Sequence, residues 1–307
     1  MIQFKRQFSK KTKAALCLAS ALLLSIPWEG ASCITLFVGL LPLMLISAQY
    51  TPSWRDTLSM LGWATLTFVI WNAATIWWVW NATPVGPIAA TICSSWWSLL
   101  PFMLYHIVSK RAPKALAYTT LITAWIAAEY IYTQAPALSF PWLTLGNGFA
   151  DDTWAVQWYE YTGVFGGSLW VLCSNVAIFE AMRTRKLSRA VLWAAIVVVP
   201  VIISLLLYWS YEPAQRTAKV AVVQPNVPCY EEERIEAGFV DPSPILVELI
   251  DEVPAGTEFV LLPESSLAYL PAVGTIEESQ TSYYAPLFRQ LHGGSGNMKM
   301  IAGASTM

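Results

Sequence analysis

Long apolar segments recur along this chain up to residue 209, and they constrain its fold more than any other feature. A helix needs roughly 20 residues to cross the hydrocarbon core of a bilayer. Seven segments approach or reach that length, at residues 13–27, 31–48, 58–80, 88–108, 116–132, 163–182 and 190–209. Composition agrees, because 56% of the residues are hydrophobic and only 12% are charged. We therefore predict a polytopic α-helical membrane bundle of seven spans.

The positions of lysine and arginine predict the orientation of the bundle. Basic residues gather before the first segment and after the second, fourth and sixth, whereas the alternate loops contain none until Arg216. Basic loops stay in the cytoplasm, so the N-terminus is predicted to be cytoplasmic and everything after residue 209 to lie on the other side. We interpret the first segment as an uncleaved span rather than a secretion signal, because another apolar segment follows it at once.

The pattern of apolar and polar residues changes after the seventh segment. This change predicts a membrane domain over 1–212 and a second domain over 213–307. Short apolar runs there alternate with proline, glycine and charge. They predict strands at 219–224, 258–262 and 299–302, with helices at 241–252 and 279–291. Alternating strands and helices indicate a largely parallel α/β sheet, and three strands with an open edge look incomplete.

Composition also limits the chemistry of the chain. Four of the five cysteines lie in apolar runs, and their spacing fits neither a disulfide framework nor a metal site. The net charge of -2 averages a basic membrane part and a more acidic tail. We therefore expect no metal, no other cofactor and no nucleic acid partner.

Glu264 is the strongest candidate for a catalytic residue. It follows the predicted buried strand at 258–262, and open α/β sheets place their sites at the carboxyl ends of strands. A partly desolvated carboxylate there can accept a proton from a nucleophile. The alternative is a helix-capping or solvated glutamate, and spacing alone does not decide between them.

Two candidates lie near the non-cytoplasmic end of the predicted bundle. Glu129 falls about one turn inside the end of the fifth segment. Burying a carboxylate in the membrane costs free energy, so this residue is a functional candidate. The alternative is a side chain that extends to the membrane interface. Phe140, Pro141 and Trp142 are candidates for a lipid-facing loop beside a substrate site. Aromatic anchors at the membrane interface are the alternative for these three residues.

Several stretches in order along the chain resemble the apolipoprotein N-acyltransferases. Trp125, Ala128 and Glu129 resemble the family's WxxxE segment, and Phe140-Pro141-Trp142 with Leu145-Gly146 resembles its FPW and LG loop. Leu262-Pro263-Glu264-Ser265 resembles the strand carrying the catalytic glutamate, with Leu262 in place of the usual tryptophan. Further matches are the aromatic stretch 72–80, the positions Gln157, Gly163, Gly166 and Asn175, and the stretch 222–226.

The resemblance implies a multi-pass enzyme of the bacterial inner membrane, with a periplasmic nitrilase-like (αββα) domain beginning in 213–307. Such enzymes transfer an acyl chain from a phospholipid to the N-terminal diacylglyceryl-cysteine of an apolipoprotein through a cysteine thioester. The resemblance assigns Glu264 as the general base, and Glu129, Phe140, Pro141 and Trp142 as candidates for substrate binding.

The lysine and the nucleophilic cysteine of the family have no match in this sequence. Only 43 residues follow Glu264 (307 minus 264), whereas both family residues lie further downstream. Cys229 precedes the glutamate and does not match the nucleophile. We therefore expect this chain alone to be inactive, either as a truncated reading frame or as one chain of a split enzyme whose second chain supplies these residues.

Two other classes of protein remain open. A membrane-anchored amidase of the nitrilase superfamily would use the same glutamate, although an anchor needs only one span. A non-catalytic scaffold or a transporter would also have many spans. Transporters usually carry mid-membrane charges and internal repeats, and neither is convincing in this sequence.

Overall fold

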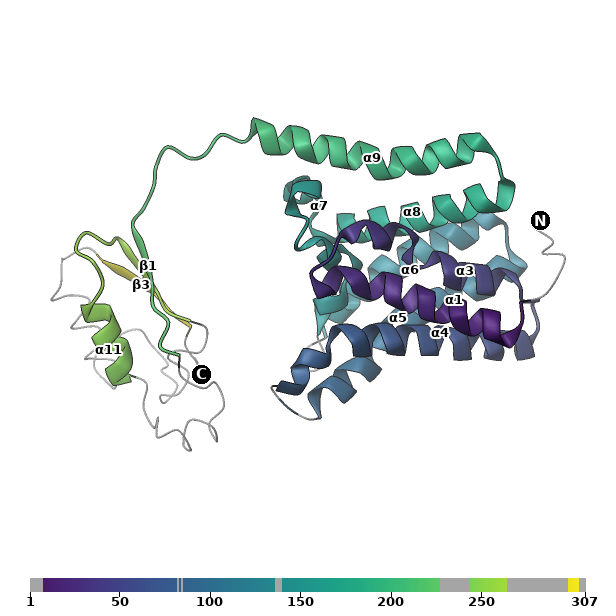
Figure 1. The fold of residues 1–307 in the computed structure, drawn as a ribbon, viewed down its shortest axis with the longest axis horizontal. Coiled ribbons are helices and arrows are strands. Elements are labelled where there is room, and N and C mark those ends of the chain that lie inside the picture. The colour runs from purple at the N-terminus through teal and green to yellow at the C-terminus, as the bar shows by residue number, and fades with distance from the viewer. Residues whose placement is uncertain are drawn as a thin grey trace. The chain divides into compact units, whose positions relative to one another are not determined.

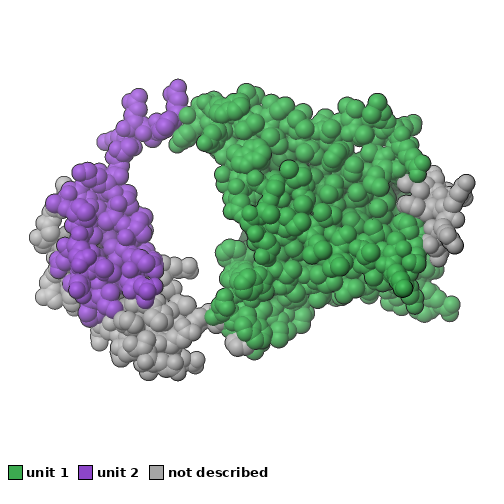
Figure 2. Space-filling model, viewed as in Figure 1, with its two compact units in different colours: residues 1–211 green, residues 212–307 purple. Residues whose placement is uncertain are grey.

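A computed structural model describes residues 8–81, 83, 85–135, 140–226, 243–263 and 298–303 of the chain. The chain divides into two compact units, Met1–Tyr211 and Glu212–Met307 (Figure 2). Unit 1 is helical and unit 2 contains a small sheet, so each is considered by itself. The predicted helix at 279–291 lies outside the described residues.

Unit 1 is a bundle of helices that run back and forth along one direction (Figure 1). Short 3-10 turns (η) connect many of them. The elements in chain order are α1 (Lys10–Ser25), η1 (Ile26–Glu29), η2 (Cys33–Thr35), α2 (Leu36–Gly39), α3 (Leu41–Ala48), α4 (Trp54–Thr75), η3 (Trp77–Asn81), α5 (Gly86–Arg111), α6 (Lys114–Thr133), η4 (Pro141–Leu143), η5 (Leu145–Phe149), η6 (Thr153–Ala155), α7 (Tyr159–Thr162), α8 (Val164–Thr184) and α9 (Leu187–Ser210).

Each of the seven predicted apolar segments contains an α-helix. Among the described residues, four helices are long and apolar enough to cross a membrane: α4, α5, α8 and α9. The second segment is shorter and is broken at Leu40, between α2 and α3. The membrane-type helical bundle is thus confirmed in coarse outline, and the count of seven spans stays a prediction.

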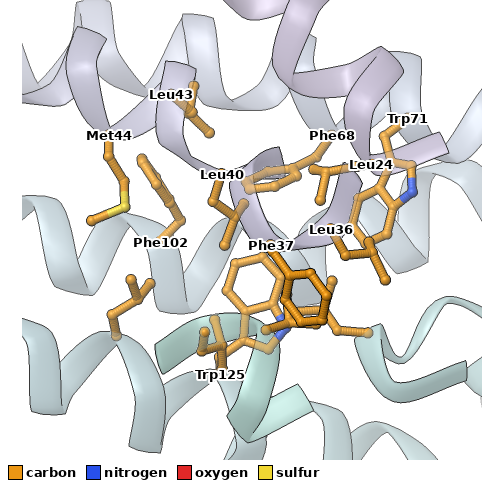
Figure 3. Packing of buried hydrophobic residues seen from close by; sticks show 14 of the residues in the cluster. Leu24, Leu36, Phe37, Leu40, Leu43, Met44, Phe68, Trp71, Phe102 and Trp125 are labelled. Carbon is orange, nitrogen blue, oxygen red and sulfur yellow. The ribbon is translucent and has the colours of Figure 1, made fainter. Parts of the chain in front are cut away.

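Aromatic and aliphatic side chains together fill the centre of the bundle (Figure 3). The ring of Phe68 in α4 lies 6.0 Å from Phe102 in α5 and 5.8 Å from Trp125 in α6, each in an edge-on arrangement. All three rings are almost completely buried. Edge-to-face contacts place the positive edge of one ring against the negative face of another, which gives helix packing a directional component. These contacts fix α6, and with it Glu129, against α4 and α5.

The break between α2 and α3 is closed by a side chain from a distant helix. Pro42 has no N–H to give the carbonyl of Val38, and the helical pairing of the backbone is interrupted in this region. Asn175 of α8 accepts a hydrogen bond from the N–H of Leu40 at 2.8 Å and donates to the carbonyl of Leu36 at 2.7 Å. Because Asn175 is fully buried, these bonds replace water at a place where unpaired backbone would be costly.

Unit 2 contains the parallel sheet that the sequence predicts. β1 (Val220–Val222), β2 (Phe259–Leu261) and β3 (Lys299–Ile301) pair in the order β1-β2-β3, with both pairs parallel. α11 (Ser243–Asp251) follows β1 in the chain and buries Leu246 and Ile250 with Val260 of the central strand. The strands and this helix fall inside the predicted ranges.

Candidate functional site

Glu129 and Trp125 form a hydrogen-bonded pair on one face of α6. The indole Nε1 of Trp125 donates to Glu129 Oε1 at 3.0 Å. Residues four apart lie one above the other on a helix, so the WxxxE spacing brings the two side chains together. Trp125 is only 2% exposed, and its contact with Phe68 holds the ring in place. The carboxylate is therefore fixed toward the interior of the bundle.

The same carboxylate oxygen fixes the loop that follows α6. The backbone N–H of Leu145, at the start of η5, donates to Glu129 Oε1 at 2.8 Å. The neighbouring Gly146 N–H donates to Ser168 Oγ of α8 at 3.0 Å, and Tyr159 Oη donates to the Gly146 carbonyl at 2.8 Å. Side chains from α6, α7 and α8 thus bind the N–H of Leu145 and both the N–H and the carbonyl of Gly146.

Glycine is required where this loop meets α8. A Cβ on Gly146 would lie 1.9 Å from the carbonyl oxygen of Val164, which is backbone and cannot move aside easily. A Cβ on Gly167 would lie 1.7 Å from Tyr159 Oη and 2.9 Å from the Cα of Gly146. The loop and the helix therefore approach each other backbone to backbone, which only the absence of side chains permits.

The second carboxylate oxygen of Glu129 is in a different position. Oε2 is buried and makes no hydrogen bond with any residue that the structure describes, although the hydroxyl of Ser168 lies nearby. Glu129 also lines a small cavity of about 20 Å³, together with Ser94, Ser98 and Thr144. That volume suits about one water molecule, and the hydroxyls would give such a water further partners.

Trp142 is presented on the surface by a turn with several backbone anchors. The carbonyl of Pro141 accepts from Asn147 Nδ2 at 2.9 Å and from Thr144 Oγ1 at 3.0 Å. The carbonyl of Trp142 accepts from Trp28 Nε1 at 3.0 Å. The ring of Trp142 is 57% exposed. The turn is thus ordered by its backbone, while the indole is left available for contact.

Aromatic rings surround Trp142 at this end of the bundle. Trp78 of η3 lies edge-on to it at 5.7 Å, and the ring of Phe140 lies 6.2 Å away. A cavity of about 600 Å³ beside Trp142 is lined by Trp28 of η1, Trp78 of η3 and residues of the loop that follows α6, including Asp151. Indole rings combine an apolar body with one N–H, which suits the boundary between lipid and water. The region can therefore receive an amphipathic molecule.

Asp152 ties the end of this loop to the second apolar segment. Its Oδ2 accepts from the N–H of Cys33 at 2.8 Å, and its Oδ1 accepts from Trp154 Nε1 at 3.0 Å. Burial raises the pKa of this carboxyl, but these hydrogen bonds outweigh burial and hold the pKa below its usual range. Asp152 therefore stays ionised and keeps the anchor at neutral pH.

The sequence candidates are only partly brought together. Glu129, Phe140, Pro141 and Trp142 all belong to the region where α6 ends and its following loop begins, within unit 1. Glu264 belongs to unit 2 and lies outside the described residues, one residue beyond Pro263 at the carboxyl end of β2. The roles of all five residues remain predictions.

Ser168 and Tyr159 were not singled out from the sequence, although both hold the loop. The run Gly166-Gly167-Ser168 was the available signal, since consecutive small residues in an apolar helix favour close backbone approach. Nothing local in the sequence identifies Gly146 as their partner. That pairing requires the tertiary structure.

Comparison with known proteins identifies the family. The family model described as the apolipoprotein N-acyltransferase N-terminal domain matches residues 20–177. A protein named apolipoprotein N-acyltransferase from Chlorobaculum tepidum is 30% identical over 206 residues, covering 64% of this chain and 37% of that protein. One of the same name from Gloeobacter violaceus is 25% identical over 285 residues, covering 81% of this chain and 50% of that protein.

The chain thus spans half or less of the length of these curated relatives. No solved structure matches it. The family model covers more than half of the chain and includes both Glu129 and the Phe140–Trp142 turn. The chain therefore belongs to the apolipoprotein N-acyltransferase family.

Proposed function

We propose that this chain provides the membrane bundle and the first part of the catalytic domain of an apolipoprotein N-acyltransferase. The proposed reaction moves an acyl chain from a phospholipid to the N-terminal diacylglyceryl-cysteine of an apolipoprotein. The observation that carries the proposal is the family match over 20–177, which includes the anchored loop between Glu129 and Gly146. Such a loop can hold Trp142 at a fixed position beside the lipid.

The proposed chemistry proceeds in two balanced steps. A cysteine thiolate attacks the ester carbonyl of the phospholipid, so that a thioester forms and a lysophospholipid leaves with its alcohol oxygen protonated. The free α-amino group of the acceptor then attacks the thioester, giving an amide and restoring the thiol. The first step needs a base for the thiol proton and a donor for the oxyanion.

We assign Glu264 to the base and no residue of this chain to the nucleophile or the oxyanion donor. Support comes from unit 2, where β2 is the central strand of a parallel sheet and Glu264 follows its carboxyl end by sequence. Open parallel sheets carry reactive groups at that edge. We propose that unit 2 is the start of a nitrilase-like domain, and that any remaining catalytic residues come from further sequence or a second chain.

The proposed base can be tested in the protein as the organism makes it. Glu264→Gln keeps the shape of the side chain and removes its basicity, so acyl transfer in isolated membranes should fall by about 100-fold or more. Glu248→Gln is the matched control, because Glu248 is an exposed carboxylate on α11 of the same unit. The readout is the mass of the N-terminal lipopeptide of a lipoprotein, which gains one acyl chain. Full activity of the Glu264 variant would refute the assignment.

We further propose a location in the bacterial inner membrane with the N-terminus in the cytoplasm. Basic residues cluster at one end of the helical bundle, at the start of α4, the end of α5 and the turn between α8 and α9. That asymmetry is what the cytoplasmic side of a membrane protein shows. A periplasm-dependent reporter enzyme fused after Ser210 should be active, and the same reporter fused after Arg111 should be inactive. The reverse pattern would overturn the orientation.

A further inference from the structure

α9 is attached to the rest of unit 1 along one side only. Ser204 alone is buried among the residues of this helix. Ser204 Oγ donates to the carbonyl of Trp154 at 2.7 Å and accepts from the N–H of Gln157 at 2.7 Å. Near the other end of the helix, Trp193 Nε1 donates to Ser174 Oγ of α8 at 2.9 Å. These polar contacts, together with a narrow stripe of half-buried apolar residues (Ile196, Val197 and Val201) that packs against the core, hold the helix in place.

A third contact lies where α9 contains a proline. Pro200 has no N–H, so the carbonyl of Ile196 four residues earlier loses its partner within the helix. Trp170 Nε1 of α8 donates to that carbonyl at 2.6 Å. The indole thus closes the gap that the proline opens, and it holds α9 at a distance set by an indole ring.

An open groove of about 600 Å³ runs beside Trp170 between the two helices. Its walls are almost entirely apolar. α8 contributes Gly166, Leu169 and Cys173, and α9 contributes residues from Ala195 to Ile203. From the first to the last of these residues the helices advance by seven steps (166 to 173) and eight steps (195 to 203), which at 1.5 Å per step corresponds to a groove of roughly 10–12 Å. One leaflet of a bilayer has a hydrocarbon depth of roughly 15 Å.

One polar group at the end of the groove lacks a partner. Trp158 lines the groove, and its Nε1 is buried without a hydrogen-bond acceptor among the described residues. The ring packs edge-on against Trp170 at 5.5 Å. Gly166 makes room for it, since a Cβ there would lie 3.0 Å from the ring. A buried donor of this kind favours any ligand that brings an acceptor.

The dimensions distinguish among possible occupants. A transmembrane helix of a partner would need roughly 20 residues, about 30 Å, and would extend well past both ends of the groove. An acyl chain matches the length and the apolar walls. A phospholipid chain also carries an ester carbonyl at its interfacial end, the end at which Trp158 lies. We propose that the groove binds one acyl chain of a phospholipid from the leaflet on the Trp142 side, with its ester carbonyl accepting from Trp158 Nε1.

This lipid is distinct from the proposed acyl donor and does not depend on catalysis. It fills the interface that the Pro200 and Trp170 pair keeps open. Recognition rests on the chain and the ester, so phospholipids with different headgroups should bind alike. The site is therefore a built-in place for a structural lipid between α8 and α9.

Photo-cross-linking in nanodiscs tests the proposal with the full chain. The probe is phosphatidylglycerol with a diazirine halfway along one acyl chain, and cross-linked peptides are mapped by mass spectrometry. Trypsin separates α8 from α9 at the basic residues between them. Cross-links should concentrate on the two peptides that line the groove. Phosphatidylethanolamine carrying the same diazirine chain should give the same pattern.

Variants decide between a site and ordinary lipid contact. Cys173→Trp should fill the groove and lower its cross-linking at least tenfold, and Ala195→Phe does the same from α9 if the first variant fails to fold. Trp158→Phe replaces the indole by a smaller aromatic ring that has no N–H, and it should lower cross-linking about threefold. Leu206→Trp is the control, because Leu206 is 60% exposed on α9 and lies outside the groove. Equal cross-linking in all variants would overturn the site, and no change in Trp158→Phe would overturn the assigned hydrogen bond.

Discussion

Replacing Glu129 by alanine or by glutamine separates a structural role of this carboxylate from a role of its charge. The two hydrogen bonds that tie the side chain to α6 and to the following loop go to one atom, Oε1, which accepts from Trp125 and from the N–H of Leu145. Glutamine keeps an acceptor oxygen at that position and places an NH₂ group at Oε2, where no described residue donates a hydrogen bond. Alanine removes the acceptor and leaves two donors without a partner.

The expected magnitudes differ clearly between the two variants. An unpaired buried donor costs roughly 1–3 kcal/mol, so Glu129→Ala should destabilise unit 1 by about 2–5 kcal/mol. Glu129→Gln should change stability by less than about 1 kcal/mol, because it retains both hydrogen bonds. At roughly 2–4 °C per kcal/mol, the alanine variant should lose on the order of 10 °C in apparent melting temperature.

Size-exclusion thermostability of the purified protein in one detergent measures both effects. Trp125→Phe is a useful companion, since it removes one of the two donors and should cost less than Glu129→Ala. A glutamine variant as unstable as the alanine variant would refute the reasoning, because the charge itself would then stabilise the fold. A stable glutamine variant with lost acyl transfer would assign the charge to the reaction.

Other contacts in unit 1 give further expectations. Gly146→Ala should destabilise strongly, whereas Gly62→Ala should be neutral or slightly stabilising, because its added Cβ would meet nothing within 4 Å; thermostability in detergent compares the two. Asn175→Ala should cost about 2–4 kcal/mol and expose the α2–α3 break to hydrogen exchange, while Asn175→Asp, which cannot donate, should recover only part of that loss. Ser204→Ala should raise proteolysis between η6 and α7 without changing the helix content measured by circular dichroism.

Much of the helical architecture could be predicted from apolar length alone. Helices that cross a bilayer must satisfy their backbone internally, so long apolar runs leave few alternatives. The pairing of Trp125 with Glu129 could also be predicted, since it follows from helical spacing. In unit 2, alternation of strand and helix was enough to predict parallel pairing, which the register of Val260 with Ala221 and Met300 confirms.

The remaining contacts depend on residues far apart in the chain. Pro42 and Pro200 signal in the sequence that a helix is interrupted. They do not reveal that Asn175 pairs with the backbone of Leu36 and Leu40 beside the first interruption, or that Trp170 takes the carbonyl that Pro200 leaves unpaired. The partners of Asn175 lie 135 and 139 residues away, and that of Trp170 lies 26 residues away. Periodicity reports the face of a helix and not its neighbour. Such partners could be found only from tertiary structure.

These contacts change how a polar residue inside the membrane part should be interpreted. A buried polar side chain in a membrane segment is by default a functional candidate. Here Asn175 and Ser204 use their hydrogen bonds on backbone groups, and they serve the fold. In Glu129 the two oxygens differ. Oε1 accepts two hydrogen bonds that hold the fold, whereas Oε2 accepts none from any described residue. Any part that Glu129 plays in substrate binding must therefore pass through Oε2, the atom that Glu129→Gln changes.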